Sequence, residues 1–135
     1  MPSVAPDAIL RQVGLRVTPQ RSLVLEALMR LPHPDAEAVF GYARQRQPNM
    51  SLATVYNVLD KLRGVGLAAM LEYRGRRHFD VRVERHDHVH CRGCGLIADI
   101  ERHANTRVVC PEDAAWIIED QALVWEGLCP SCRTG

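Results

Sequence analysis

The 135-residue sequence has no uninterrupted apolar run of the length that a secretory signal or a membrane span requires. We therefore expect a cytoplasmic protein without a membrane partner, in a compartment where thiols stay reduced. Aromatic residues make up only 5% of the chain, so its cores must be built mainly from Leu, Val, Ile and Ala. The sequence also has no His-Glu-x-x-His motif and no separate candidate nucleophile, which argues against an enzyme. No small organic ligand is expected.

Net charge is also low, because 17 Lys and Arg oppose 16 Asp and Glu. The two parts of the chain differ, however. Residues 1–80 hold eleven basic against seven acidic residues, whereas residues 81–135 hold six against nine. A basic part joined to an acidic part is typical of a DNA-reading domain beside a domain that binds a partner or a metal.

Helical periodicity and turn residues divide the first part into four helices followed by a hairpin. Helices are expected at residues 7–13, from 19, from 36 and from 52, with N-caps at Thr18, Asp35 and Ser51. Strands are expected at 67–73 and 77–81, around a turn whose arginines Arg74, Arg76 and Arg77 are placed for phosphates. This order predicts a winged helix-turn-helix domain over residues 1–82.

Residues 83–135 form the second expected domain, which is richer in strands. Strands are expected around Val89, at 96–100 and at 116–125, with a short helix at 102–110. The fold class is therefore α+β, a winged helix joined to a second domain of mixed helices and strands. Small domains bury little surface, so a metal or a partner subunit is expected to stabilise this one.

Two Cys-x-x-C pairs predict a structural zinc site. They are separated by thirty-four residues and consist of Cys91 with Cys94 and Cys129 with Cys132. Four thiolates close the tetrahedral shell of a structural Zn²⁺ ion and leave no position open for chemistry. Redox or incidental pairs are the alternative interpretation. The fifth cysteine, Cys110, has no partner at useful spacing and receives no role.

Three of the six histidines, His86, His88 and His90, alternate just before the first cysteine pair. On a strand they point to one face, where imidazoles suit iron, manganese, nickel or zinc. A solvated polar strand is the alternative. Further ligands are expected from His33, Asp80 and Asp99. One ion shared by both domains would couple metal occupancy to DNA affinity.

Together these motifs resemble the ferric uptake regulator family along nearly the whole chain. The matching segments are Gly14–Arg21, His33–Glu37, Ser51–Tyr56, His86–His88 with Cys91 and Cys94, and Gly127–Cys132. The resemblance implies a homodimeric repressor that binds palindromic double-stranded operator DNA when it holds metal. It places the recognition helix at 51–63, with Tyr56 and Asn57 facing bases. Arg16 would reach the DNA backbone or minor groove, and Ser51 and Thr54 would contact phosphates.

Within the family, the peroxide-sensing branch is the closer resemblance. Asn57 stands where iron-sensing members usually carry Arg, and Asp99 where they more often carry Glu. The set His33, Asp80, His86, His88 and Asp99 then implies a regulatory Fe²⁺ or Mn²⁺ site, with His33 and His86 as the oxidised ligands. The alternative is a metal-uptake regulator that senses iron, manganese, nickel or zinc without peroxide chemistry.

His90 is outside the peroxide-sensing set and resembles part of the four-histidine site of nickel-sensing relatives. His78 and His103 are expected to be bystanders. Two interpretations from other functional classes also remain. The first is a metalloenzyme that uses the His and Asp cluster, and the second is a zinc-ribbon interaction module whose N-terminal helices serve only as a hydrophobic core. Metal-dependent binding of a palindromic duplex distinguishes the repressor from both.

Overall fold

The computed structural model describes residues 5–81, 86–101, 115–117 and 123–134. The chain divides into two compact units, Met1–Val83 and Glu84–Gly135. Each unit is described by itself below. No helix among the described residues is long and apolar enough to cross a membrane.

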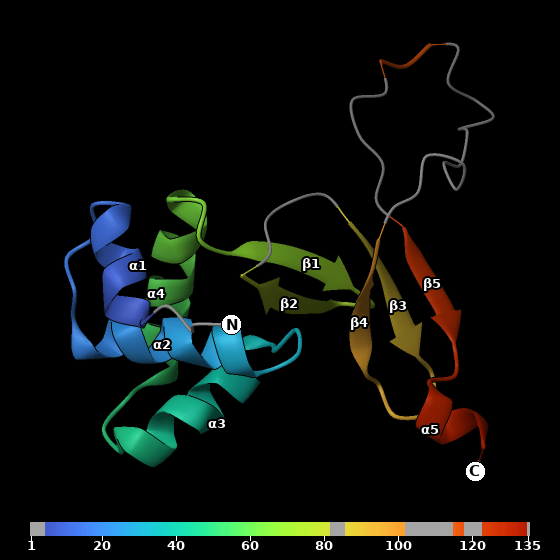
Figure 1. The fold of residues 1–135 in the computed structure, drawn as a ribbon, viewed down its shortest axis with the longest axis horizontal. Coiled ribbons are helices and arrows are strands. Elements are labelled where there is room, and N and C mark those ends of the chain that lie inside the picture. The colour runs from blue at the N-terminus through green and yellow to red at the C-terminus, as the bar shows by residue number, and fades with distance from the viewer. Residues whose placement is uncertain (1–4, 82–85, 102–114, 118–122, 135) are drawn as a thin grey trace. The chain divides into compact units, whose positions relative to one another are not determined.

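Four helices make up most of the first unit (Figure 1). They are α1 (Pro6–Gln12), α2 (Pro19–Arg30), α3 (Ala36–Arg46) and α4 (Leu52–Gly64). The three predicted N-caps are confirmed: side-chain oxygens of Thr18, Asp35 and Ser51 accept the backbone N–H three residues later, at 3.1, 2.8 and 3.1 Å. Each cap satisfies one of the donors that a helix start leaves without an internal partner. The starts of α2, α3 and α4 are therefore set locally by the sequence.

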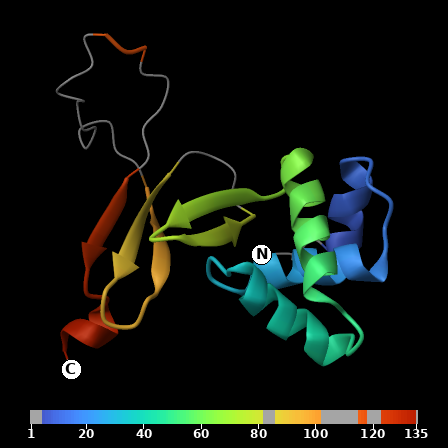
Figure 2. The same ribbon diagram turned by 180° about the vertical axis from the view of Figure 1, so that it is seen from behind.

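The core of this unit forms around α2, which packs against α1, α3 and α4 (Figure 2). Its buried side chains are almost all aliphatic, as the shortage of aromatic residues requires. From α4 they include Val55, Val58, Leu59 and Leu62, which recur at helical spacing along one face. The opposite face of α4 therefore stays at the surface.

A β-hairpin follows α4 and completes the winged helix-turn-helix. Strands β1 (Ala69–Tyr73) and β2 (Arg76–Asp80) pair antiparallel. The two residues between them, Arg74 and Gly75, have φ angles of 52° and 79°. Two successive positive φ angles match the right-handed twist of the paired strands. Phe79 on β2 is buried in the helical core, which anchors the wing to the helices.

The second unit contains a three-stranded sheet with β3 (Asp87–Cys91) at its centre. Strand β4 (Ile97–Ile100) pairs antiparallel on one side of β3, and β5 (Val124–Gly127) pairs parallel on the other. The short helix α5 (Pro130–Arg133) follows β5. With the helical first unit, this sheet confirms the α+β class.

The strand expected at 116–125 is shorter than predicted. Trp116 and Ile117 lie in no strand, and β5 begins only at Val124. The pairing of β5 with β3 explains why β5 begins there. Val124 is paired with His88 near the beginning of β3, so residues before Val124 have little of β3 to pair with. The helix expected at 102–110, with His103 and Cys110, lies outside the described residues.

Replacing Ser51 by Ala is expected to destabilise the first unit by about 1 kcal/mol, because the start of α4 loses its capping oxygen. Thermal unfolding of the DNA-free protein measures this loss. Ser51→Asn keeps a capping oxygen and should stay within a few tenths of a kcal/mol of wild type. An equal loss in both variants would show that the cap is not the cause.

Candidate metal centres

The parallel pairing of β3 with β5 brings the two cysteine pairs together. Cys91 is the last residue of β3 and the register partner of Gly127, the last residue of β5. The two strands therefore end at the same edge of the sheet. Cys94 follows in the turn after β3, Cys129 is the N-cap of α5, and Cys132 lies within α5. The four sulfur atoms lie within 4.8 Å of one another. The structure thus assembles all four cysteines that the sequence singled out.

The geometry of this cluster fits a tetrahedral zinc ion. Zn–S bonds of about 2.3 Å place neighbouring sulfurs of a tetrahedron about 3.8 Å apart. The Sγ atoms of Cys94 and Cys129 are 3.8 Å apart. The Cys91 sulfur also accepts the backbone N–H of Cys129 at 3.3 Å. Such N–H groups stabilise negative charge on sulfur, as zinc–thiolate sites require.

The pKa values of the thiols also favour a metal site at this cluster. Backbone N–H groups of Cys129, Cys94 and Gly93 lower the pKa of Cys91 to about 6. Hydrogen bonding among the crowded sulfurs, from Cys129 first, raises the pKa of Cys132 to about 12. The Cys91 thiol therefore loses its proton readily. The Cys132 thiol keeps its proton, because a further thiolate would lie close to other negatively charged sulfurs. A divalent cation at the centre removes that repulsion, so the cluster is suited to a metal ion.

Gly93 leaves room that any side chain would fill. A Cβ atom at this position would lie 3.0 Å from Sγ and 3.1 Å from Cβ of Cys132. We expect Gly93→Ala to displace Cys132 and to release zinc at a lower chelator concentration than wild type. A zinc indicator dye measures the release. Gly127→Ala is the matched control, since nothing lies within 4 Å of its added Cβ; equal release from both variants would contradict the steric explanation.

The second unit also gathers part of the histidine set. The Nε2 atom of His86 lies 2.7 Å from Oδ1 of Asp99, and Nε2 of His88 lies 3.6 Å from the same oxygen. The rings of the two histidines are tilted, with centroids 4.5 Å apart. Strand pairing explains the meeting, because His88 on β3 is the register partner of Asp99 on β4. Two imidazole nitrogens and a carboxylate form a donor set suited to first-row metals.

The first unit carries a second histidine–carboxylate pair. His33, in the turn before α3, places Nε2 3.2 Å from Oδ2 of Asp80 at the end of β2. These residues are 47 positions apart in the sequence. Each unit therefore contains a nitrogen–oxygen pair at a spacing compatible with ligands of a metal ion.

His90 is placed differently from the other two histidines of its motif. Its Nδ1 lies 3.1 Å from Oε1 of Glu126. Glu126 on β5 is its register partner, whereas His88 meets Asp99 of β4 on the opposite side of β3. His88 and His90 share one face of β3, because they are two residues apart. Sharing a face is nevertheless not enough to bring both imidazoles next to the same carboxylate.

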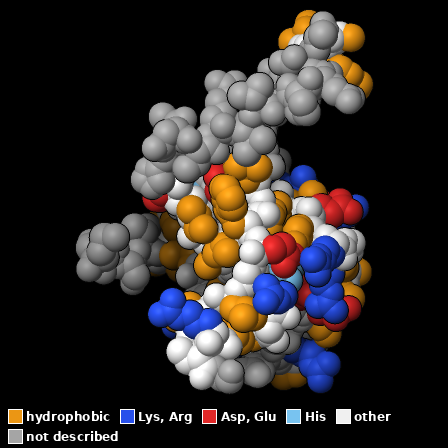
Figure 3. Space-filling model, turned by 90° about the vertical axis from the view of Figure 1, so that its right-hand side faces the viewer, with side chains coloured by type: hydrophobic (Ala, Val, Ile, Leu, Met, Phe, Trp, Pro, Cys, Tyr) orange, Lys and Arg blue, Asp and Glu red, His pale blue; other side chains and the backbone are white. Residues whose placement is uncertain are grey.

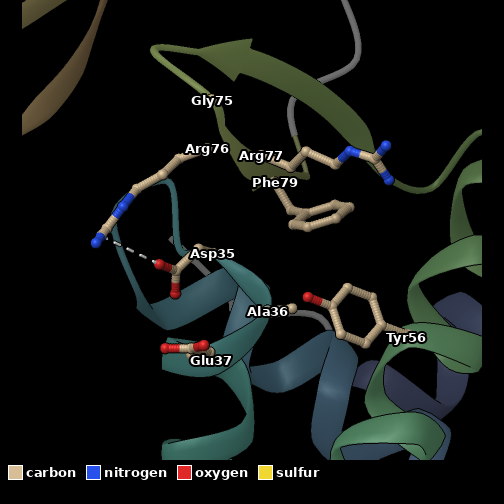
Figure 4. A pocket seen from close by; sticks show the side chains of 8 residues that line it. All are labelled: Asp35, Ala36, Glu37, Tyr56, Gly75, Arg76, Arg77 and Phe79. Carbon is tan, nitrogen blue, oxygen red and sulfur yellow. Dashed lines mark ion pairs between the residues drawn. The ribbon is translucent and has the colours of Figure 1, made fainter.

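The predicted DNA contacts lie on the open face of α4, on the wing and in the segment before α2. Tyr56, Asn57 and Ser51 are exposed, Thr54 is half-buried, and Arg16 is exposed in the segment before α2. A cleft of about 330 Å³ lies between Tyr56 and the wing. Figure 4 shows Tyr56 on one side of this cleft and, on the other side, Arg76 and Arg77, which leave β2 in different directions. Arg76 approaches Asp35 at the start of α3, with 3.6 Å between Nη1 and Oδ2.

Hydrophobic side chains are exposed on the second unit. The large ones are Leu96, Ile100, Trp116, Ile117, Trp125 and Leu128. Figure 3, seen from the side on which Figure 1 draws β5, shows hydrophobic side chains gathered at the surface. A patch of this kind is typical of a surface that another subunit covers.

A unit with a winged helix-turn-helix and a unit with a four-cysteine cluster are the parts expected of a metal-binding transcriptional regulator. Comparison with known proteins identifies the family. The sequence profile of the ferric uptake regulator family matches residues 12–112. The chain therefore belongs to the ferric uptake regulator family, whose members are dimeric, metal-responsive, DNA-binding regulators rather than enzymes.

Individual relatives agree with this assignment. The Mycobacterium tuberculosis transcriptional regulator FurA is 35% identical over 127 residues, covering 91% of this chain and 86% of that protein. The Bacillus subtilis peroxide operon regulator is 40% identical over 92 residues, covering 67% and 63%. Among solved structures, the Vibrio cholerae ferric uptake regulator matches with a TM-score of 0.68 at 24% identity, over 91% and 98% of the chains, which shows the shared fold.

Two further residues, His78 and Glu126, contact candidate ligands, which their local sequence did not predict. His78 contacts the backbone of His33, with 2.9 Å between its Nδ1 and the carbonyl oxygen. Glu126 faces His90. The signal for His78 is its alternation with Asp80 on one strand, since residues two apart share a face. No local signal exists for Glu126, because its meeting with His90 depends on the pairing of distant strands.

Proposed function

We propose that this chain is a cytoplasmic, metal-dependent repressor that binds palindromic operator DNA as a homodimer. Cys91, Cys94, Cys129 and Cys132 hold a structural Zn²⁺ ion. The regulatory Fe²⁺ or Mn²⁺ ion is held by His33 and Asp80 together with His86, His88 and Asp99. The observation that carries this proposal is that each compact unit contains its own histidine–carboxylate set at ligand spacing.

The division of the ligands between the units explains how metal can control DNA binding. His33 and Asp80 belong to the first unit, which contains the recognition helix α4. His86, His88 and Asp99 belong to the second unit. An ion that takes ligands from both restricts the orientation of one unit toward the other. Metal and DNA then favour the same arrangement, so that each raises the affinity for the other.

Dimerisation is supported by the exposed hydrophobic residues of the second unit. Buried apolar area drives association between subunits, and a palindromic operator mirrors the two-fold symmetry of a dimer. The reading surface of each subunit consists of the exposed face of α4, with Arg16 and the wing beside it. Tyr56 and Asn57 face bases, while Ser51 and Thr54 contact phosphates.

Operator binding tests the proposal directly. A palindromic duplex selected from random DNA should be shifted by zinc-loaded protein only when Mn²⁺ or Fe²⁺ is added. His86→Ala should abolish the metal-dependent shift. His90→Gln is the matched control, because the structure pairs this ring with Glu126. Failure to bind any duplex with any first-row metal would refute a repressor, whereas loss of binding in His90→Gln would favour the four-histidine site.

Asn57→Ala is expected to weaken operator binding by roughly 5- to 150-fold, the range for losing one good base contact. The loss should depend on the base pair opposite residue 57, because an amide reads a base edge rather than the backbone. Titrations of base-substituted duplexes measure this. An equal loss on every duplex would instead assign Asn57 to the phosphates.

Among family members, the peroxide-responsive type fits best. Support comes from Asp99 in the ligand set, from Asn57 on α4, and from the 40% identity to the Bacillus subtilis peroxide operon regulator. The Campylobacter jejuni peroxide stress regulator also shares the fold, with a TM-score of 0.63 at 26% identity over 93% and 97% of the chains. The second candidate is a metal-uptake regulator without peroxide chemistry, which the 35% identity to FurA favours.

A further inference from the structure

Alternate side chains of β2 all contact the turn that carries His33. Arg76 approaches Asp35 with 3.6 Å between Nη1 and Oδ2. Two residues later, Nδ1 of His78 lies 2.9 Å from the carbonyl oxygen of His33. Another two residues later, Asp80 meets Nε2 of His33 at 3.2 Å. The period of two along a strand therefore places the ligand Asp80 and the neighbour His78 on the same face, against the same turn.

The hydrogen bond from His78 has a defined direction. A carbonyl oxygen can only accept, so Nδ1 of His78 must carry the proton and donate it to His33. The next carbonyl, that of Pro34, accepts the backbone N–H of Phe79 at 2.8 Å. Two successive carbonyl groups of the turn are thus fixed by two successive residues of β2. Figure 4 shows the neighbouring part of this interface, where Arg76 reaches Asp35.

The backbone of His33 requires such support. Its φ angle is 43°, in the left-handed region that a residue with a side chain rarely adopts. A conformation of this kind is energetically unfavourable and persists only where surrounding contacts hold it. The carbonyl that His78 contacts belongs to the same strained residue, so this contact acts on the backbone that orients the imidazole.

We propose that His78 is a positioning residue of the regulatory metal site, holding the left-handed backbone of His33 so that its imidazole faces Asp80. The inference rests on the proposed function of His33 and Asp80 as ligands. His78 itself does not bind the ion. Its hydrogen bond orients His33 toward Asp80 in the metal-free protein. Metal binding then requires less rearrangement of these two ligands. Outer partners that orient metal ligands typically contribute 10- to 100-fold to affinity.

His78→Leu and His78→Asn test the proposal in the full-length, zinc-loaded protein. The Leu variant removes the donor, whereas the Asn amide carries an N–H close to the position of Nδ1. Competition with a chelating dye should show Mn²⁺ affinity at least roughly ten-fold weaker in His78→Leu and near wild type in His78→Asn. In metal-free protein, amide hydrogen exchange at Phe79 should be faster in the Leu variant alone.

His33→Ala separates this inference from the proposed function. If His33→Ala weakens Mn²⁺ binding while His78→Leu binds like wild type, the metal site stands and the positioning role is wrong. If the Leu and Asn variants lose affinity equally, the role of the Nδ1 donor is also wrong. Wild-type Mn²⁺ affinity in His33→Ala would refute the proposed ligand set itself.

Discussion

Cys94→Ser is expected to release the structural zinc and to unfold the second unit while the first unit stays folded. In the described residues, the second unit has a sheet of three short strands and only two buried apolar side chains, Cys91 and Ile97. Apparent zinc-binding energies of about 10–16 kcal/mol in small domains exceed what such a core supplies. The first unit instead has its own aliphatic core around α2.

The two units can be followed separately in one experiment. Amide hydrogen exchange should show loss of protection at β3, β4 and β5 in Cys94→Ser, and unchanged protection in α2 and α4. Cys110→Ser is the control, since Cys110 is expected to have no role at the zinc site; it should keep one zinc ion per chain. A Cys94→Ser protein that retains protected β strands would show that zinc is not what stabilises this unit.

The loss of zinc should also abolish operator binding, because a dimer contacts both half-sites and a monomer contacts one. Size-exclusion chromatography with light scattering should report a monomer for Cys94→Ser. A variant that stays dimeric and binds the operator normally would refute the proposal that the second unit forms the dimer.

The second large effect concerns peroxide. With Fe²⁺ at the regulatory site, modest hydrogen peroxide is expected to abolish operator binding, whereas the Mn²⁺ form should keep it. His33 and His86 are the expected targets, each gaining one oxygen atom on its imidazole. An oxidised ring is a poorer metal ligand, so the proposed regulatory ion should be released and metal-dependent DNA binding lost.

Mass spectrometry of peptides that contain His33 or His86 measures the modification. Asp99→Glu should blunt the response to peroxide while leaving Mn²⁺-dependent DNA binding intact. His90 provides an internal control, because its contact with Glu126 places it outside the proposed ligand set. Unmodified peptides under full iron loading would contradict the peroxide-sensing type and favour the metal-uptake regulator.

Much of the first unit was predictable because its signals are local. Thr18, Asp35 and Ser51 are N-caps in the structure as they are by sequence, since a cap involves only residues three positions apart. The buried face of α4 follows from helical spacing alone. The strand predicted at 116–125 was too long because pairing with β3, not local propensity, determines where β5 begins.

The sequence by itself determined the family, the winged helix and which four cysteines form one cluster, because spacing and residue type carry that information. Only the tertiary structure decided which histidine meets which carboxylate. His88 and His90 are alike in sequence, yet β3 directs one to Asp99 on β4 and the other to Glu126 on β5. His78 likewise gained a partner in His33, 45 residues away, through the packing of β2 on a turn. Such meetings depend on strand register and packing between distant segments, which no local pattern encodes.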